Sequence, residues 1–178
     1  MSCSVAGSVG RRRTVLPAAV LAGLALLSSC HQWLGRALTP AEHQRVRHWL
    51  ECEECVAGAL DSVVAIGSPA VPALGDALLH GPGQPRVDSL ADFLQHSYQS
   101  LAVHVQQHPG LNLSESQLEY VGRFTTTYTS TYRIRSARAL ALIGGSGTRH
   151  LLDQALNLPL TPYVRAHIRL LRDSVWHP

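Results

Sequence analysis

Helix-start and helix-stop residues recur through most of this 178-residue chain, and the apolar residues between them follow helical spacing. The clearest start is at residues 39–42, where Thr, Pro, Ala and Glu combine an N-cap, a proline at the first helical position and the glutamate of a capping box. The residues that follow place Val46, Trp49 and Leu50 on one side of a helix. We expect this helix to continue to Gly67, with a break allowed near Gly58. The pattern predicts an all-α chain.

The later helices are predicted from signals of the same kind. In chain order these are a restart at Ser68 and Pro69, a loop at residues 81–85, an N-cap at Asp88, a stop at Pro109, a start at Ser114, a helix linker at residues 144–147, and a last start at Thr161 and Pro162. Residues 125–132 are polar and mostly β-branched, so the sequence leaves a helix connection, an irregular helix end and an extended segment all open.

Two stretches of the chain share one pattern, which is a helix, an Ile-Gly pair and a second helix that carries Leu-x-x-Ala-Leu. Residues 63–78 can be laid on residues 140–156 with one residue inserted after the glycine. A second overlap joins residues 132–137 to residues 163–166, and each of these stretches places an arginine, Arg135 or Arg165, after a β-branched apolar residue. We expect both arginines to hydrogen-bond helix ends or neighbouring repeats rather than to bind a substrate.

This pattern resembles HEAT repeats, including the HEAT-like repeats first described in phycobilin lyases, over about residues 50–80 and 130–178. Residues 85–125 depart from it. The resemblance implies a short right-handed α-solenoid of stacked helix pairs, because a single pair cannot bury its apolar stripe alone. A general helical bundle with glycine-terminated helices is the alternative, and it is also all-α.

The first 29 residues have the organisation of an export signal, with three arginines, a short apolar run and small residues at its end. The apolar run is shorter than the roughly 20 residues of a membrane-spanning helix. Residues 27–30, Leu-Ser-Ser-Cys, resemble the bacterial lipobox, which implies that Cys30 is lipid-modified and becomes the first residue of the mature protein. An ordinary signal peptide cleaved nearby and an uncleaved anchor are the alternatives.

We therefore expect a lipoprotein signal peptide over residues 1–29, a tether over residues 30–38 and a HEAT-like helical domain over residues 39–178. The lipid anchor would hold the domain at a bacterial membrane, facing the periplasm. His31 follows the cysteine in place of the aspartate that in many Gram-negative lipoproteins signals retention in the inner membrane. The resemblance therefore favours the outer membrane.

The formal net charge of +3 belongs to the signal, because residues 1–29 hold three arginines and no acid. The rest of the chain balances 12 arginines against 12 acidic residues. It therefore lacks the basic surplus that nucleic-acid binding requires. All 15 basic residues are arginine, which excludes a lysine nucleophile and a P-loop lysine.

Cys52 and Cys55 form a C-x-x-C pair, which is the chain's only chemical motif. A structural disulfide is favoured because exported proteins fold in an oxidising compartment. Residues three apart in a regular helix have Cβ atoms about 5–6 Å apart, whereas a disulfide needs roughly 3.5–4.5 Å. The pair is therefore expected in a first turn or at a distortion, and a reduced pair packed on the inner face is an alternative.

Redox and metal-binding roles for the pair are two further alternatives, and each has a specific weakness. A thioredoxin-like role lacks a βαβ context, and the flanking residues Glu51, Glu53 and Glu54 disfavour a thiolate. A metal site would add His48 to the two cysteines on one helical face, but the span from residue 48 to residue 55 is about 10.5 Å on a straight helix.

No other catalytic constellation is found in the sequence, which has no nucleophile elbow, His-Glu-x-x-His motif or phosphate-binding glycine loop. Trp33, Trp49 and Trp176 are expected in the core or at helix caps. We expect no cofactor and no nucleic-acid partner. The predicted function is that of a lipid-anchored, non-enzymatic protein whose helical-repeat surface binds another protein of the envelope. The alternative is a thiol-redox or metal-handling envelope protein that uses Cys52 and Cys55.

Overall fold

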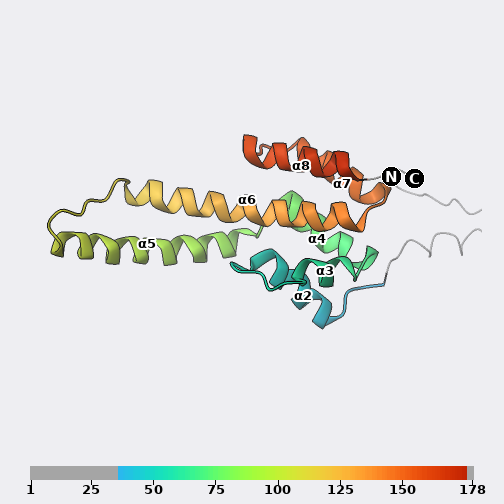
Figure 1. Ribbon diagram of the computed structural model, residues 1–178, viewed down its shortest axis with the longest axis horizontal. Helices are drawn as coiled ribbons and strands as arrows, with labels where there is room; N and C mark the ends of the chain where they lie inside the picture. The colour runs from blue at the N-terminus through green and yellow to red at the C-terminus, as the bar shows by residue number, and fades with distance from the viewer. Residues whose placement is uncertain (1–35, 176–178) are drawn as a thin grey trace, which may run out of the picture. The chain divides into compact units, whose positions relative to one another are not determined.

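The computed structural model describes residues 36–175, and this part of the chain is helical with no β-strand (Figure 1). Its elements are α2 (Pro40–Glu51), α3 (Ala59–Val64), the 3-10 helix η2 (Ser68–Ala70), α4 (Val71–His80), α5 (Gln84–Gln107), α6 (Gln117–Ile143), α7 (Ser146–Leu156) and α8 (Pro162–Ser174). The predicted all-α class is confirmed for these residues. The predicted signal, Cys30, Trp33 and Trp176 lie outside the described residues.

The capping box predicted at residues 39–42 is confirmed. Thr39 Oγ1 accepts a hydrogen bond from the Glu42 backbone N–H, and the Glu42 carboxylate accepts one from the Thr39 N–H at 2.8 Å. Both terminal nitrogens of Arg36 donate to this carboxylate at 2.7 Å. The Arg36 hydrogen bonds, followed by those from Thr39, hold the pKa of Glu42 well below its ordinary value. The chain is thus fixed from Arg36 onward.

The break allowed near Gly58 in the first predicted helix is confirmed, but it starts already at Cys52, and the helix after it ends at Val64 rather than Gly67. Helix α2 ends at Glu51, because Cys52 leaves the helix with extended backbone angles (φ −61°, ψ 134°). A connection over residues 52–58 then leads into α3, a separate helix of six residues that follows Gly58. Gly58 has a φ of 82°, a conformation that favours glycine.

Two predicted helix starts are also wrong, and the loop expected at residues 81–85 is shorter. Helix α5 begins at Gln84 rather than at Asp88, because Pro85 in the first turn needs no N–H partner. Helix α6 is capped by Ser116 rather than Ser114, since Ser116 forms the capping box with Glu119. The linker expected at residues 144–147 is shorter as well, and α7 begins at Ser146.

Residues 125–132, whose conformation the sequence left open, lie inside the 27-residue helix α6. The Thr125 hydroxyl donates to the Val121 carbonyl at 2.9 Å, and the Thr127 hydroxyl donates to the Arg123 carbonyl at 2.8 Å. These bonds to the preceding turn satisfy the hydroxyl groups without interrupting the helix. β-Branched residues have a low intrinsic preference for helix, so the helical conformation here is stabilised by contacts with α5 and with the core helices.

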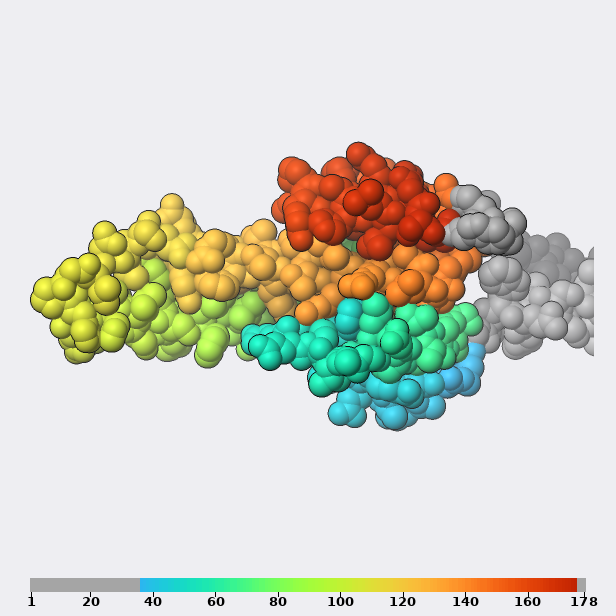
Figure 2. Space-filling view, viewed as in Figure 1, coloured from blue at the N-terminus to red at the C-terminus, as the bar shows by residue number. Residues whose placement is uncertain are grey.

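The described helices form a body and an arm. The arm, residues 84–131, consists of α5 and the first half of α6, which run antiparallel and extend away from the other helices (Figures 1 and 2). The body is the rest of residues 36–175. The buried residues of the hydrophobic core cluster all belong to the body. Helix α5 contributes one buried residue in 24, Leu94, and it lies outside that cluster.

Helix α6 joins the parts of the body, because it contacts α2, α3, α4, α7 and α8. Its buried residues all lie in its second half, and they are Tyr132, Ser136, Ala137, Ala139 and Leu140. Helices α4 and α7 also pack together closely. A Cβ atom on Gly75 of α4 would lie 2.9 Å from Leu151 Cδ1 of α7, so a side chain at this position would displace the end of the leucine.

Two neighbouring leucines of α6 test where the core lies. Leu140 is fully buried, whereas Leu142 is 56% exposed. We expect Leu140→Ala to lower the free energy of unfolding by about 3 kcal/mol, through lost apolar burial and a residual cavity. Leu142→Ala, the matched control, should cost less than about 1 kcal/mol. Urea denaturation followed by circular dichroism measures both, and equal losses for the two variants would contradict this packing.

Candidate functional site

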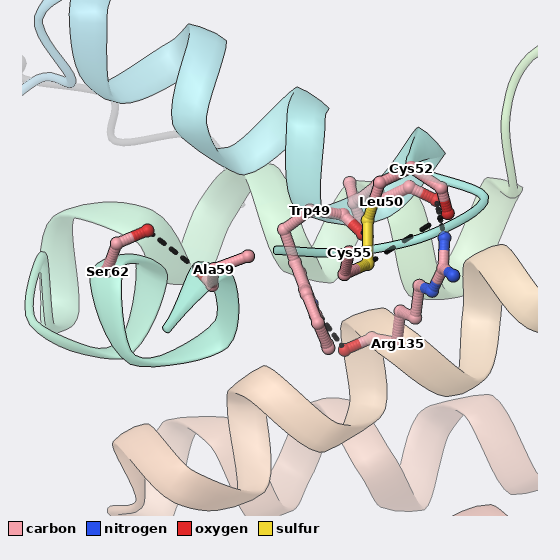
Figure 3. Close-up of a disulfide and its surroundings, with 7 residues drawn as sticks. All are labelled: Trp49, Leu50, Cys52, Cys55, Ala59, Ser62 and Arg135. Atoms are coloured by element: carbon pink, nitrogen blue, oxygen red, sulfur yellow. Dashed lines mark hydrogen bonds between the residues drawn. A yellow bond between two sulfur atoms is a disulfide. The ribbon is translucent and has the colours of Figure 1, made fainter. Parts of the chain in front are cut away.

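The C-x-x-C segment forms the connection between α2 and α3 (Figure 3). Cys52 and Cys55 are joined in a disulfide, with 5.2 Å between their Cα atoms. Cys52 is the C-cap residue of α2, so the pair lies just beyond the helix. The pair lies neither in the first turn of a helix nor at a distortion within one, which were the expected places. Because Cys55 is outside any helix, the Cβ spacing of a regular helix does not limit the disulfide. The prediction that His48, Cys52 and Cys55 share one helical face is therefore wrong.

Trp49 and Arg135 fasten this segment to α6 (Figure 3). The Trp49 indole N–H donates to the Arg135 carbonyl at 3.2 Å, and Arg135 Nη1 donates to the Leu50 carbonyl at 3.2 Å. The Arg135 guanidinium carbon lies 5.8 Å from the centre of the Trp49 ring. Burial lowers the pKa of Arg135, but an arginine stays charged near neutral pH. The expected roles of Trp49 in the core and of Arg135 at a helix end are confirmed.

Arg165 acts at another helix end in the same way. Its Nη1 donates to the Leu156 carbonyl at 2.6 Å, and its Nη2 donates to the Leu158 carbonyl at 3.0 Å. These carbonyls lie at and just beyond the C-terminus of α7, where backbone acceptors lack helical partners. The predicted helix-end role of Arg165 is therefore also confirmed.

The disulfide is half-buried at the edge of the core. Both cysteines pack against the core cluster, whereas Glu53 and Glu54 between them point to solvent. Cys52 Sγ lies 3.4 Å from the Trp49 carbonyl oxygen. Because a disulfide sulfur carries no proton, this is a packing contact. While the bond is intact, neither cysteine offers a thiolate to a substrate or a metal ion. Reduction would create a dithiol at a surface that a partner can reach.

A hollow of about 490 Å³ lies beside the end of α2, where α5 and α6 enter the body. Its lining includes Glu51, Arg86, Phe93 and Tyr128. Arg86 forms an ion pair with Glu51 and also donates to the Tyr132 hydroxyl at 3.3 Å. Phe93 is 67% exposed, and burial raises the pKa of Tyr128. This combination of a neutralised ion pair and aromatic rings suits contact with an apolar side chain better than binding of an ion.

The sequence analysis did not single out this hollow. Its lining residues come from the end of α2, from α5 and from the middle of α6, and they share no sequence motif. Their association depends on the antiparallel pairing of α5 with α6, which brings Phe93 near Tyr128. The predicted starts of both helices were also misplaced, so the register between them could not be obtained from the sequence.

Exposed apolar side chains are concentrated on the arm. Six of the ten large apolar residues that are exposed in residues 36–175 lie between positions 93 and 124. They are Phe93, Leu101, Val103, Leu111, Leu118 and Phe124. Leu118 has the greatest exposure, 83%. Monomeric proteins rarely leave large contiguous apolar patches in water, so such patches commonly mark interaction sites.

Polar and aromatic contacts hold the outer part of the arm together. The Tyr98 hydroxyl on α5 donates to the Glu115 carbonyl at 2.7 Å, and the rings of Tyr98 and Tyr120 are 5.5 Å apart. Arg123 makes two hydrogen bonds to the Glu115 carboxylate, and its guanidinium carbon lies 4.3 Å from the centre of the Phe124 ring. The pairing of the two helices thus persists where the body no longer supports them.

Residues 36–175 contain neither a cluster of metal-ligating side chains nor a membrane-spanning helix. Within residues 36–175, no group of three or more His, Cys, Asp or Glu side chains is placed to hold a metal ion. None of the helices in this range, including the two long ones of the arm, combines the length and hydropathy of a membrane span. Comparison of the whole chain with protein-family models, curated proteins and solved structures gives no match.

Reduction of the disulfide tests its structural contribution. Closing the short loop between Cys52 and Cys55 restricts the unfolded chain, for which the loop-entropy relation gives about 2 kcal/mol. We expect a reductant to lower the free energy of unfolding of the full chain by this amount in urea denaturation. The Cys52→Ser, Cys55→Ser double variant is the control and should not respond to the reductant. A wild-type transition that does not move on reduction would contradict a structural role.

Proposed function

We propose that this protein is a lipid-anchored, non-enzymatic scaffold of the bacterial cell envelope that binds another protein through its arm. The observation that carries the proposal is the concentration of six exposed large apolar side chains between Phe93 and Phe124, on a helix pair with one buried residue, Leu94. Burial of such residues against a partner would supply the main favourable free energy of association. The adjoining hollow with Phe93 and Tyr128 would accept a side chain of that partner.

We further propose that the body is a short right-handed solenoid of HEAT-like helix pairs, with the arm as an insertion. The helix contacts of the body and the turns between its helices support this proposal. Helices α3 and α8 both pack on α6, and α4 packs on α7, as expected for stacked pairs. The pairs α3–α4 and α6–α7 each turn at a glycine with positive φ, 71° at Gly67 and 73° at Gly144. The arm then accounts for residues 85–125, where the repeat pattern fails.

The proposed anchor rests on the sequence of the first 30 residues. Residues 1–29 would be removed as a signal peptide, Cys30 would carry the lipid, and residues 30–38 would be the tether. Arg36, where the capping contacts of α2 begin, lies six positions after Cys30, and such a segment reaches at most about 20 Å. The domain would therefore stay close to the periplasmic face of the membrane, and the outer membrane is the one that His31 favours.

The second candidate is a thiol-redox or metal-handling envelope protein. The observation that favours it is the half-exposed Cys52–Cys55 disulfide beside a hollow with aromatic walls. A partner dithiol could exchange with this disulfide: one partner thiolate would form a mixed disulfide, and the second would release it, so that the partner is oxidised to a disulfide and Cys52 and Cys55 become a dithiol. Metal binding by these cysteines would need the same reduction first, because a cysteine binds a metal ion as the thiolate and not as a disulfide.

Site-specific photo-crosslinking in the native bacterium tests the scaffold proposal. A benzoylphenylalanine in place of Leu118 on the arm should crosslink to one protein of defined mass. The matched control replaces Leu170 on α8, which is 70% exposed but lies on the body. We expect no such product at position 170. Crosslinks of equal yield at both positions, or at neither, would contradict a docking arm.

Two further changes in the same strain separate the anchor and the second candidate from the scaffold. Cys30→Ala should release the protein from the membrane fraction and weaken crosslinking through loss of co-localisation. The Cys52→Ser, Cys55→Ser double variant should retain the crosslink if the protein is a scaffold. If this variant is folded and membrane-bound but loses the crosslink, the thiol-redox candidate is favoured instead.

A further inference from the structure

A second hollow lies where the arm leaves the body, lined by α6 and by the connection from α7 to α8. Its volume is about 260 Å³. Nine of the described residues line it, and none of them is acidic. Arg133 is the one charged residue among the nine. The hollow therefore presents a positive charge without a carboxylate beside it.

The guanidinium of Arg133 is incompletely satisfied. Its Nη2 donates to the Leu79 carbonyl at 3.4 Å, which is its one hydrogen bond within the described residues. Its Nε is buried under the turn at Gly81 and has no acceptor there. Burial lowers the pKa of Arg133, and no neighbouring acid opposes the effect. Because the Gly81 turn does not line the hollow, an anion bound there would meet the terminal nitrogens of the guanidinium and not this Nε.

Other arginines of the described chain are satisfied differently. Arg36, Arg86, Arg123 and Arg172 each form an ion pair with a carboxylate. Arg133 lies at a comparable depth to Arg86 but faces hydroxyl groups instead of an acid. Arg135 and Arg165 also lack an acid, but Arg165 donates twice to backbone carbonyls and Arg135 lies against the Trp49 ring, whereas Arg133 has one long bond within the described residues and keeps donors free for an acceptor in the hollow.

Hydroxyl groups extend the site along one face of α6. Thr126, Thr129 and Ser130 precede Arg133 by seven, four and three residues, and this spacing places all four side chains on the same side of a helix. None of the three hydroxyls has a hydrogen-bond partner within residues 36–175, whereas those of Thr125 and Thr127 bond to the preceding turn. Three hydroxyl donors next to a guanidinium make a set that suits a tetrahedral oxyanion.

We propose that this hollow binds a phosphate or sulfate group, with Arg133 as the charge partner and the hydroxyls of Thr126, Thr129 and Ser130 as donors. The N-terminus of α8, at Thr161 on the opposite wall, adds a favourable dipole. The hollow is larger than one such group, so it has room for part of the molecule that carries it. Free phosphate or sulfate and the phosphate headgroup of a lipid share this chemistry. The site does not depend on what the arm binds.

Thermal unfolding of the full chain in detergent tests the site. The melting temperature is measured in sodium phosphate, sodium sulfate and sodium chloride at matched ionic strength. A bound ion stabilises the folded state by mass action, whereas the general salting effect of phosphate and sulfate acts on every variant alike. We expect the apparent affinity of Arg133→Gln for phosphate to be weaker by about tenfold or more. Arg138→Gln, at an exposed position on the same helix, is the matched control and should behave as wild type.

A second variant keeps the test decisive if Arg133→Gln fails to fold. The Thr129→Val, Ser130→Ala double variant retains the guanidinium and removes two donors, and we expect its affinity to fall by about threefold or more. Dihexanoyl phosphatidic acid, a soluble lipid with a phosphate headgroup, distinguishes a lipid ligand from free phosphate. Tighter binding than inorganic phosphate indicates a lipid headgroup, and equal or weaker binding indicates the free ion. The proposal fails if wild type responds alike to phosphate, sulfate and chloride, or if neither set of substitutions changes the response.

Discussion

The packing of the second half of α6 is the interaction on which the rest of the structure depends. Ala137, Ala139 and Leu140 have no exposed surface, and helices on several sides meet there. Alanines at these positions let neighbouring backbones approach closely, so small residues here are as necessary as large ones. Ser136 adds a buried hydrogen bond to the Leu74 carbonyl of α4. The disulfide segment depends on the same half-helix, since Trp49 donates to the Arg135 carbonyl and Arg135 donates to the Leu50 carbonyl.

The arm follows from the same helix, because α6 continues without interruption from the arm into the core. Its 27 residues correspond to a length of about 40 Å, and the first half has α5 as its main partner. Two antiparallel helices alone bury little surface, and the arm accordingly has one buried apolar residue, Leu94, and leaves six large ones exposed. The proposed docking surface is therefore a consequence of geometry. A helix pair that extends away from a small body cannot cover its own apolar residues.

Local signals in the sequence predicted much of the fold. Thr39 and Thr161 cap α2 and α8, as predicted. Helix α6 ends at Ile143, just before Gly144, where the Ile-Gly pair predicted a helix end. Errors arose where tertiary packing overrides local preference, as in the threonine-rich part of α6, or where two candidate caps compete, as at Ser114 and Ser116. The two hollows were beyond reach for another reason. Each is built from segments far apart in sequence, such as Arg133 with Thr161, and their proximity depends on how the helices pair.

Hydrogen–deuterium exchange of the full chain, followed by mass spectrometry of its peptides, tests the central claim most directly. That claim is a division between a packed body centred on α6 and an arm whose apolar residues stay exposed until a partner binds. Amides that open only with global unfolding exchange slowest, whereas regions with few buried contacts open locally. The account predicts the slowest exchange at residues 132–143 and faster exchange at residues 93–118 in the absence of a partner. Equal protection of the two ranges would show one cooperative unit and would contradict the account.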